Sequence, residues 1–89
     1  MHCCTTFQFK KEMFITRRNN DIGKYVDHIP LPDPIQIIKI DEYQSKYIYE
    51  YKKTKCQWFY IIKNDTKEII SWDYISNPDL CYHELTIRQ

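Results

Sequence analysis

Two of the four cysteines in this chain stand where they could close a disulfide around a predicted β-hairpin. In residues 58–74, two runs of aromatic and β-branched residues flank a short polar turn, which is typical of a hairpin. Cys56 precedes this segment and Cys81 follows it. If oxidised, the pair would tie the C-terminal tail to the start of the hairpin and stabilise the fold by roughly 3–4 kcal/mol. Two reduced, half-buried thiols are the alternative, which is natural for a chain without an export signal.

The other thiols and imidazoles could act as soft metal ligands. His2, Cys3 and Cys4 are consecutive, and one residue separates Cys81 from His83. Structural zinc sites use paired C-x₂-C spacings, and neither group has one. We therefore expect no metal site.

Catalysis by a cysteine and a histidine needs a thiolate, a base within hydrogen-bonding reach and an oxyanion site. The four cysteines and three histidines form no such motif. The single glycine, Gly23, excludes the Gly-rich loops that bind phosphates and dinucleotides. We expect no catalytic residue, no cofactor and no enzymatic activity.

Basic and aromatic residues alternate over residues 46–58. Tyr and Trp give a large contact area at low entropic cost and are enriched at protein interfaces. The sequence thus predicts a non-enzymatic interaction module that binds another protein, such as an inhibitor or an immunity-type protein that acts by surface contact. The aromatic residues predicted to bind the partner are Tyr47, Tyr49, Tyr51 and Trp58. The basic residues predicted at the rim of this surface are Lys52, Lys53 and Lys55.

Two other functions fit the same residues. The tyrosines could stack the bases of a single-stranded nucleic acid while the lysines contact phosphates. Thirteen basic against twelve acidic residues leave a net charge of +1, which does not favour general attraction to nucleic acids. A small disulfide-stapled protein of the cell envelope is the other alternative. The high content of Ile, Lys, Asn and Tyr is typical of AT-rich microbial or viral coding sequences.

The compartment depends on the cysteines. No apolar run is long enough to span a bilayer, and the N-terminus lacks the basic and apolar regions of a signal peptide. The default expectation is a cytoplasmic protein. A bridge between Cys56 and Cys81 would instead point to the cell envelope.

The elements that must position these residues form a single small domain of the α+β or mainly β class. Residues 35–89 predict an antiparallel β-meander, with three to five strands within residues 35–87. We expect these strands at 35–40, at 47–52, in the two arms of the hairpin and at 82–87. A turn at Asn77, Pro78 and Asp79 precedes the last of them.

The N-terminal segment, residues 1–34, is harder to assign. Residues 5–16 fit either a strand, by the spacing of Phe7 and Phe9, or a helix, and we expect a strand followed by a loop over residues 17–21. Residues 28–34 hold three of the four prolines, which predicts an extended connector. The segment should pack on one face of the sheet or pair at its edge.

The register of the hairpin can be predicted from its turn. A four-residue loop at 64–67 makes Lys63 and Glu68 the flanking pair, with opposite charges side by side. A three-residue loop would pair Trp58 with Trp72 but separates apolar from polar residues less well. The apolar residues that pair across the arms in the preferred register form the expected core face: Phe59, Ile61, Ile70 and Trp72.

Overall fold

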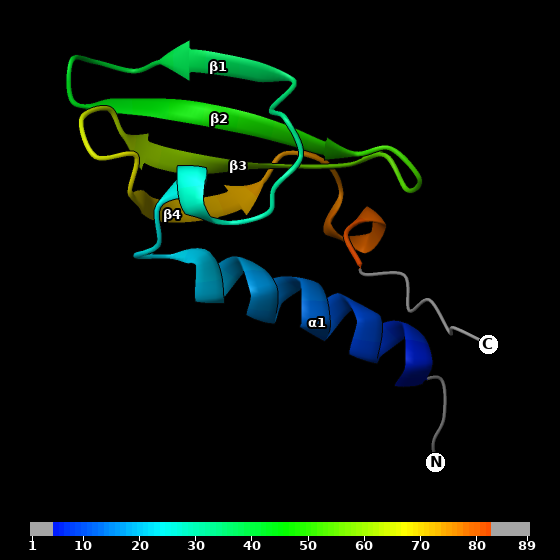
Figure 1. The fold of residues 1–89 in the computed structure, drawn as a ribbon. Helices are drawn as coiled ribbons and strands as arrows, with labels where there is room; N and C mark the ends of the chain where they lie inside the picture. The colour runs from blue at the N-terminus through cyan, green and yellow to red at the C-terminus, as the bar shows by residue number, and fades with distance from the viewer. Residues whose placement is uncertain (1–4, 83–89) are drawn as a thin grey trace.

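The computed structural model describes residues 5–82, which form one α-helix and a four-stranded antiparallel sheet (Figure 1). The elements in chain order are α1 (Thr5–Asp21), η1 (Val26–His28), β1 (Gln36–Lys39), β2 (Gln44–Tyr51), β3 (Cys56–Lys63), β4 (Ile69–Tyr74) and η2 (Pro78–Leu80). The strands neighbour one another in sequence order, so the sheet is the predicted meander. This confirms the α+β class. The strand expected at 82–87 falls, except for Tyr82, outside the described residues, and Tyr82 itself is not in a strand.

The N-terminal element is helical, so the strand predicted over residues 5–16 and the loop over residues 17–21 were wrong. The two-residue spacing of the first phenylalanines favours a strand only locally. The rest of the segment is rich in Lys, Arg, Glu and Met, which have high helix propensity. Helical periodicity also places Phe14 and Arg18, four residues apart, on one side, and both are buried. Packing of that side on the sheet selects the helix.

The chain that leaves α1 pairs with the edge of β4. Gly23 has a φ of +91°, a left-handed conformation that glycine adopts without steric cost and that turns the chain beyond the helix end. Its N–H donates to the carbonyl of Ile69 (2.8 Å), and the Ile69 N–H donates to the carbonyl of Lys24 (2.8 Å). Of the N-terminal segment, residues 5–34 both cover a face of the sheet and pair at its edge. The connector predicted over residues 28–34 forms only in part, because His28 ends the 3₁₀ helix η1, whereas Ile29 is extended and residues 30–34 belong to no helix or strand. A proline restricts only itself and the residue before it, so Pro30 does not prevent His28 from being helical.

The turn of the β3–β4 hairpin forms as predicted. Ile62 pairs with Ile69, the Lys63 N–H donates to the carbonyl of Glu68 (2.9 Å), and the Lys63 Nζ lies 3.8 Å from a Glu68 carboxylate oxygen. Lys67 closes the loop with a φ of +68°. The four-residue loop is confirmed.

Beyond this turn the register differs from the prediction, because a β-bulge interrupts the ladder at Ile70. Ile61 pairs with Ser71 instead of Ile70, and Phe59 pairs with Asp73 instead of Trp72. A shift of one residue exchanges the two faces of a strand. The core face predicted for β3 was also wrong, since Trp58, Tyr60 and Ile62 are buried whereas Phe59 and Ile61 are only half-buried on the other face.

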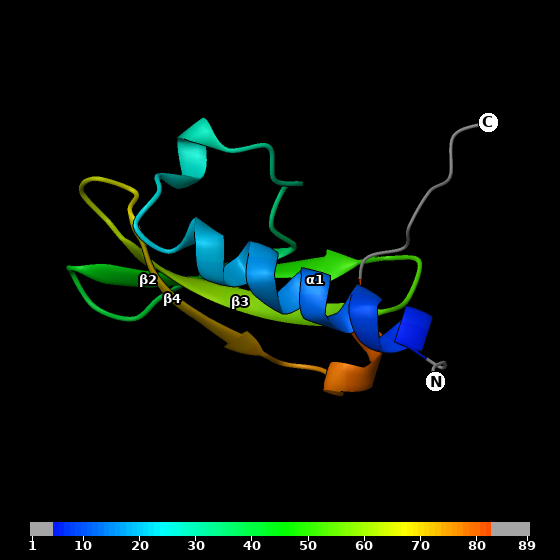
Figure 2. The ribbon, with the colours of Figure 1, turned by 90° about the horizontal axis from the view of Figure 1, so that it is seen from below.

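The core is an aromatic cluster between α1 and the inner face of the sheet. Phe14 meets Trp58 edge-on at 5.3 Å between ring centroids, Trp72 edge-on at 6.0 Å and Tyr74 stacked at 6.2 Å. Tyr49 stacks on Trp58 at 5.5 Å. The buried residues that complete this core are Tyr60, Ile62, Ile69, Cys56 and Cys81. Figure 2 shows α1 lying across a single face of the sheet.

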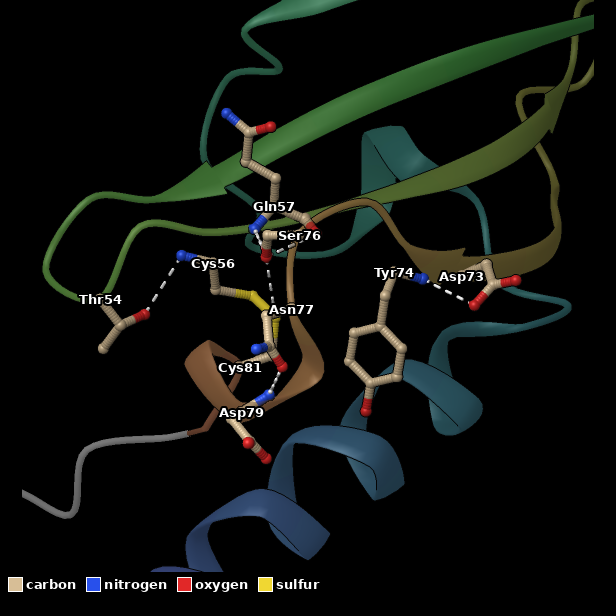
Figure 3. Close-up of a disulfide and its surroundings, with 9 residues drawn as sticks. All are labelled: Thr54, Cys56, Gln57, Asp73, Tyr74, Ser76, Asn77, Asp79 and Cys81. Atoms are coloured by element: carbon tan, nitrogen blue, oxygen red, sulfur yellow. Dashed lines mark hydrogen bonds between the residues drawn. A yellow bond between two sulfur atoms is a disulfide. The ribbon is translucent and has the colours of Figure 1, made fainter.

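Cys56 and Cys81 form a disulfide, as one of the two sequence alternatives predicted, and both are buried (Figure 3). The bridge joins the first residue of β3 to the residue that follows η2. The Asn77 side chain caps η2 by accepting from the Asp79 N–H (2.9 Å), which confirms a turn at this point. The segment between β4 and η2 also pairs with β3, since the Gln57 N–H donates to the Ser76 Oγ (2.9 Å). The disulfide thus closes a region that hydrogen bonds already align.

Reduction of this disulfide should destabilise the fold strongly. The bridge closes a loop of 25 residues, and the entropy of that loop corresponds to roughly 3–4 kcal/mol of unfolding free energy. A C56S/C81S variant should lose about this amount in urea titrations followed by Trp fluorescence. The matched control is wild-type protein in reductant, which should unfold like the variant. Equal midpoints for oxidised and reduced wild type would contradict the prediction.

Candidate functional site

The aromatic row predicted to bind a partner lies on the face of the sheet that α1 covers. Strand β2 alternates as expected, so Tyr47, Tyr49 and Tyr51 share this face. Tyr49 is 1% exposed and Trp58, opposite it on β3, is 4% exposed, whereas Tyr47 and Tyr51 are half-buried. The centre of the row is interior because the helix that we had expected to be a strand packs over it. Tyr49 and Trp58 cannot serve as surface contacts in this conformation.

The lysines predicted at the rim lie in the exposed turn between β2 and β3. Lys52 and Lys53 line a cleft together with Tyr51 and Trp58, whereas Lys55 is not part of its lining. Lys55 has a φ of +66° within the turn. The structure therefore brings four of the seven predicted residues together, at a cleft instead of an open face.

The cleft has a volume of about 850 Å³ and lies between α1, the proline-rich segment 30–35 and the turn end of the β2–β3 hairpin. Figure 2 shows α1 and this segment on the same face of the sheet. Sequence reasoning missed Arg18, which lines the cleft and is 6% exposed, because residues 17–21 were expected to form a loop. Its spacing of four residues from Phe14 is the helical signal that would have found it.

The Arg18 guanidinium is held among aromatic rings in the interior. Its central carbon lies 4.9 Å from the ring centroids of both Phe14 and Trp58, at the range of cation–π contact. One terminal nitrogen lies 3.6 Å from a carboxylate oxygen of Asp21. The same oxygen accepts a short hydrogen bond from the Tyr60 hydroxyl. The Asp21 carboxylate therefore interacts with two groups, the Arg18 guanidinium at 3.6 Å and the Tyr60 hydroxyl.

Burial raises the pKa of Tyr60 far above its ordinary value near 10. The hydrogen bond to Asp21 raises this pKa further, and the Arg18 charge opposes the shift. Burial likewise raises the pKa of Tyr49, and to a lesser extent that of Tyr74. The interior thus keeps these phenols neutral.

Strand β1 forms an edge of the sheet, far from α1 (Figure 1). All four of its residues are exposed, and Ile37 is 54% exposed. The exposed isoleucines on and beside β1 are Ile35, Ile37, Ile38 and Ile40. The other edge, at β4, is partly paired by residues 23–26, and nothing among the described residues pairs with the outer side of β1. Four of the ten exposed large apolar side chains of the described residues thus lie on or beside this edge.

The face of the sheet that α1 leaves uncovered is also partly apolar. Phe59 and Ile61 point to this face and are half-buried, and Ile48 lies between them and β1. Lys46 places its ammonium 4.5 Å from the centroid of the Phe59 ring. This face continues the apolar surface of the β1 edge.

No group of three or more His, Cys, Asp or Glu side chains within residues 5–82 could hold a metal ion. Of the sequence candidates, His2, Cys3, Cys4 and His83 lie outside the described residues, and Cys81 is used in the disulfide. In the described part of the chain, no helix is both long and apolar enough to span a membrane.

Comparisons of this chain with protein-family models, with curated proteins and with solved structures found no match.

The buried phenols make alkaline stability a test of this interior. An unfolded tyrosine ionises near pH 10, whereas Tyr49 and Tyr60 stay protonated in the folded state, so the unfolded chain binds fewer protons above pH 10. Stability should therefore be constant below pH 10 with respect to these groups and fall as the pH rises beyond it. Phenolate absorbance should show them titrating only as the protein unfolds. The Y60F variant, which lacks one of the two groups, should show a shallower loss. Ionisation of all eight tyrosines in protein that stays folded would contradict this.

Proposed function

We propose that this protein is a non-enzymatic interaction module that binds another protein by adding a strand of the partner to the β1 edge. The observation that carries the proposal is the outer side of β1, which pairs with no strand of residues 5–82 and is flanked by exposed isoleucines. This keeps the predicted class of function but moves the contact from the tyrosine row of β2 to β1, the neighbouring edge strand.

The backbone of β1 supports strand addition. In an antiparallel ladder, alternate residues point their N–H and C=O groups toward opposite neighbours. The Ile40 N–H donates to the carbonyl of Gln44 (3.0 Å), in register with the pairing of Ile38 and Lys46. The backbone groups of Ile37 and Lys39 accordingly point away from β2. An extended peptide laid along this side would satisfy them, as in known strand-addition complexes.

The side chains of β1 provide apolar surface that a bound strand of the partner would bury. Ile37 lies on the inner face beside Tyr47, and Ile38 lies on the outer face beside Lys46. Natural edge strands are commonly protected by charges, prolines or bulges, and here Lys39 is the only charge within the strand. An exposed apolar edge of this kind is typical of an interaction site.

The alternative of single-stranded nucleic-acid binding is less well supported, because Tyr49 is buried and cannot stack a base. A partner that is blocked by this contact would make the protein an inhibitor or an immunity-type protein.

The disulfide favours function in an oxidising compartment, such as the cell envelope. Counting of free thiols in natively purified protein tests this part of the proposal. Protection of Cys56 and Cys81 from alkylation supports it, and full alkylation of both would overturn it.

Loss of one edge isoleucine should abolish partner capture without unfolding the protein. An I37K variant places a charge on the proposed interface, yet Ile37 is 54% exposed, so stability should change by no more than about 0.5 kcal/mol. The wild-type protein, immobilised as bait for an extract of the native host, should recover a polypeptide that the I37K bait loses by about tenfold or more. The control is I22K, which alters an equally apolar side chain, 44% exposed, away from the β1 edge. Equal recovery by all three baits would rule out the β1 edge.

A second variant separates strand addition from contact through side chains alone. I37P removes the N–H that points away from β2, and proline is tolerated at such a position of an edge strand. Capture should be lost with I37P. Capture that persists with I37P but is lost with I37K would show that the partner docks on the isoleucines without joining the sheet.

A further inference from the structure

We infer that the cleft between α1, the proline-rich segment 30–35 and the β2–β3 hairpin binds a small organic carboxylate with an apolar body. This inference does not depend on the proposed function. It rests on two buried hydrogen-bond donors without a partner among the described residues, which belong to two residues that line the cleft, and on the charge of the residues around them.

The two donors are the Arg18 Nε and the Trp58 Nε1. Neither has a hydrogen-bond partner among the described residues, and both atoms are shielded from solvent. Buried N–H groups are nearly always paired, since leaving one unpaired forfeits its hydration. Trp72 provides the contrast within the same core, because its Nε1 donates to the Asn19 side-chain oxygen (2.9 Å). The two unpaired N–H groups are therefore able to donate hydrogen bonds to an acceptor on a ligand.

The two donors belong to side chains in cation–π contact, and the inference places one ligand group within reach of both. The Arg18 guanidinium carbon lies 4.9 Å from the centroid of the Trp58 ring. A carboxylate offers two oxygens, each with two lone pairs, and pairs well with a guanidinium edge and a second N–H. The head group of the ligand is therefore an oxyanion.

Charge around the cleft favours the same head group. Its lining contains four basic side chains and two acidic ones, Asp33 and Glu50. Asp21, the carboxylate nearest Arg18, is 3.6 Å away and also accepts from the Tyr60 hydroxyl, so the guanidinium is only partly neutralised. An anionic ligand would complete this neutralisation, whereas an amine would meet repulsion.

The remainder of the cleft fits an apolar body. Phe14, Leu31 and Ile35 contribute apolar wall, and the volume of about 850 Å³ lies within the range of small-molecule sites. One wall is the segment that contains Pro30, Pro32 and Pro34, none of which has a backbone N–H with which to join the sheet. A ligand that displaces this wall slightly gains access to the two shielded donors.

The test uses the whole oxidised chain and octanoate as the probe, with octylamine and octanol as probes of equal chain length. In proton–nitrogen correlation spectra, millimolar octanoate should shift the signals of the Trp58 indole N–H and the Arg18 Nε–H. The Trp72 indole N–H, which already has a partner, should stay in place and serves as the internal control. Octylamine should move none of these signals, and octanol should bind about tenfold more weakly than octanoate, the loss of one hydrogen bond to a charged group.

A W58F variant removes one donor and retains an aromatic ring in the core. Octanoate affinity should fall about tenfold in W58F and stay unchanged in W72F. Absence of any shift at Trp58 and Arg18, equal shifts with octylamine, or equal affinity in W58F and wild type would each overturn the inference. If W58F does not fold, the comparison of the Trp58 and Trp72 signals in wild-type protein decides the question.

Discussion

The packing of Phe14 against the aromatic face of the sheet is the contact on which the rest of this structure depends. Its ring touches Trp58, Trp72 and Tyr74, which come from two strands. Aromatic pairs of this geometry contribute about 0.5–1.5 kcal/mol each beyond the area that they bury. Most of the stability of a helix such as α1 comes from packing of its apolar side on the rest of the protein, and this contact supplies that packing. The same contact therefore stabilises the helix and determines which face of the sheet is buried.

Part of this arrangement could be predicted from residue types alone. Strand alternation in β2 and the four-residue turn after Lys63 follow from local preferences and form as expected. The proline-rich connector follows from the same preferences and forms except at His28, which belongs to η1. The inner face of β3 could not be predicted in the same way. The local pattern places Phe59 and Ile61 opposite apolar residues, and only the extra residue at Ile70 reverses this pairing. The bulge depends on the packing of α1 against the sheet, and the sequence pattern predicts a strand in place of this helix.

The wrong prediction of a strand in place of α1 also explains why the tyrosines of β2 are not the exposed surface that the sequence predicts. The tyrosines of β2 suit an interface or a core equally well by type, and the presence of α1 decides for the core. A helix is about 10 Å wide, whereas four strands spaced by about 4.8 Å extend over nearly twice that distance. One helix therefore covers only part of the sheet. It packs on β3 and β4, and the isoleucines of β1 remain exposed as a geometric consequence.

The stability of the fold does not by itself explain why Arg18 is buried. An unpaired buried N–H costs about 1–3 kcal/mol, which is a large fraction of the stability of a small domain. A leucine or methionine at this position would fill the space between Phe14 and Trp58 without that cost. Cation–π contacts with the two rings offset part of it, but the Nε remains without a hydrogen-bond partner among the described residues. Arg18 and Trp58, which carry the two unpaired N–H groups, line a cleft with an excess of basic side chains. A ligand that accepts hydrogen bonds from these two N–H groups would remove the energetic cost of leaving them unpaired. For this reason we regard the cleft as a binding site and not as a packing defect.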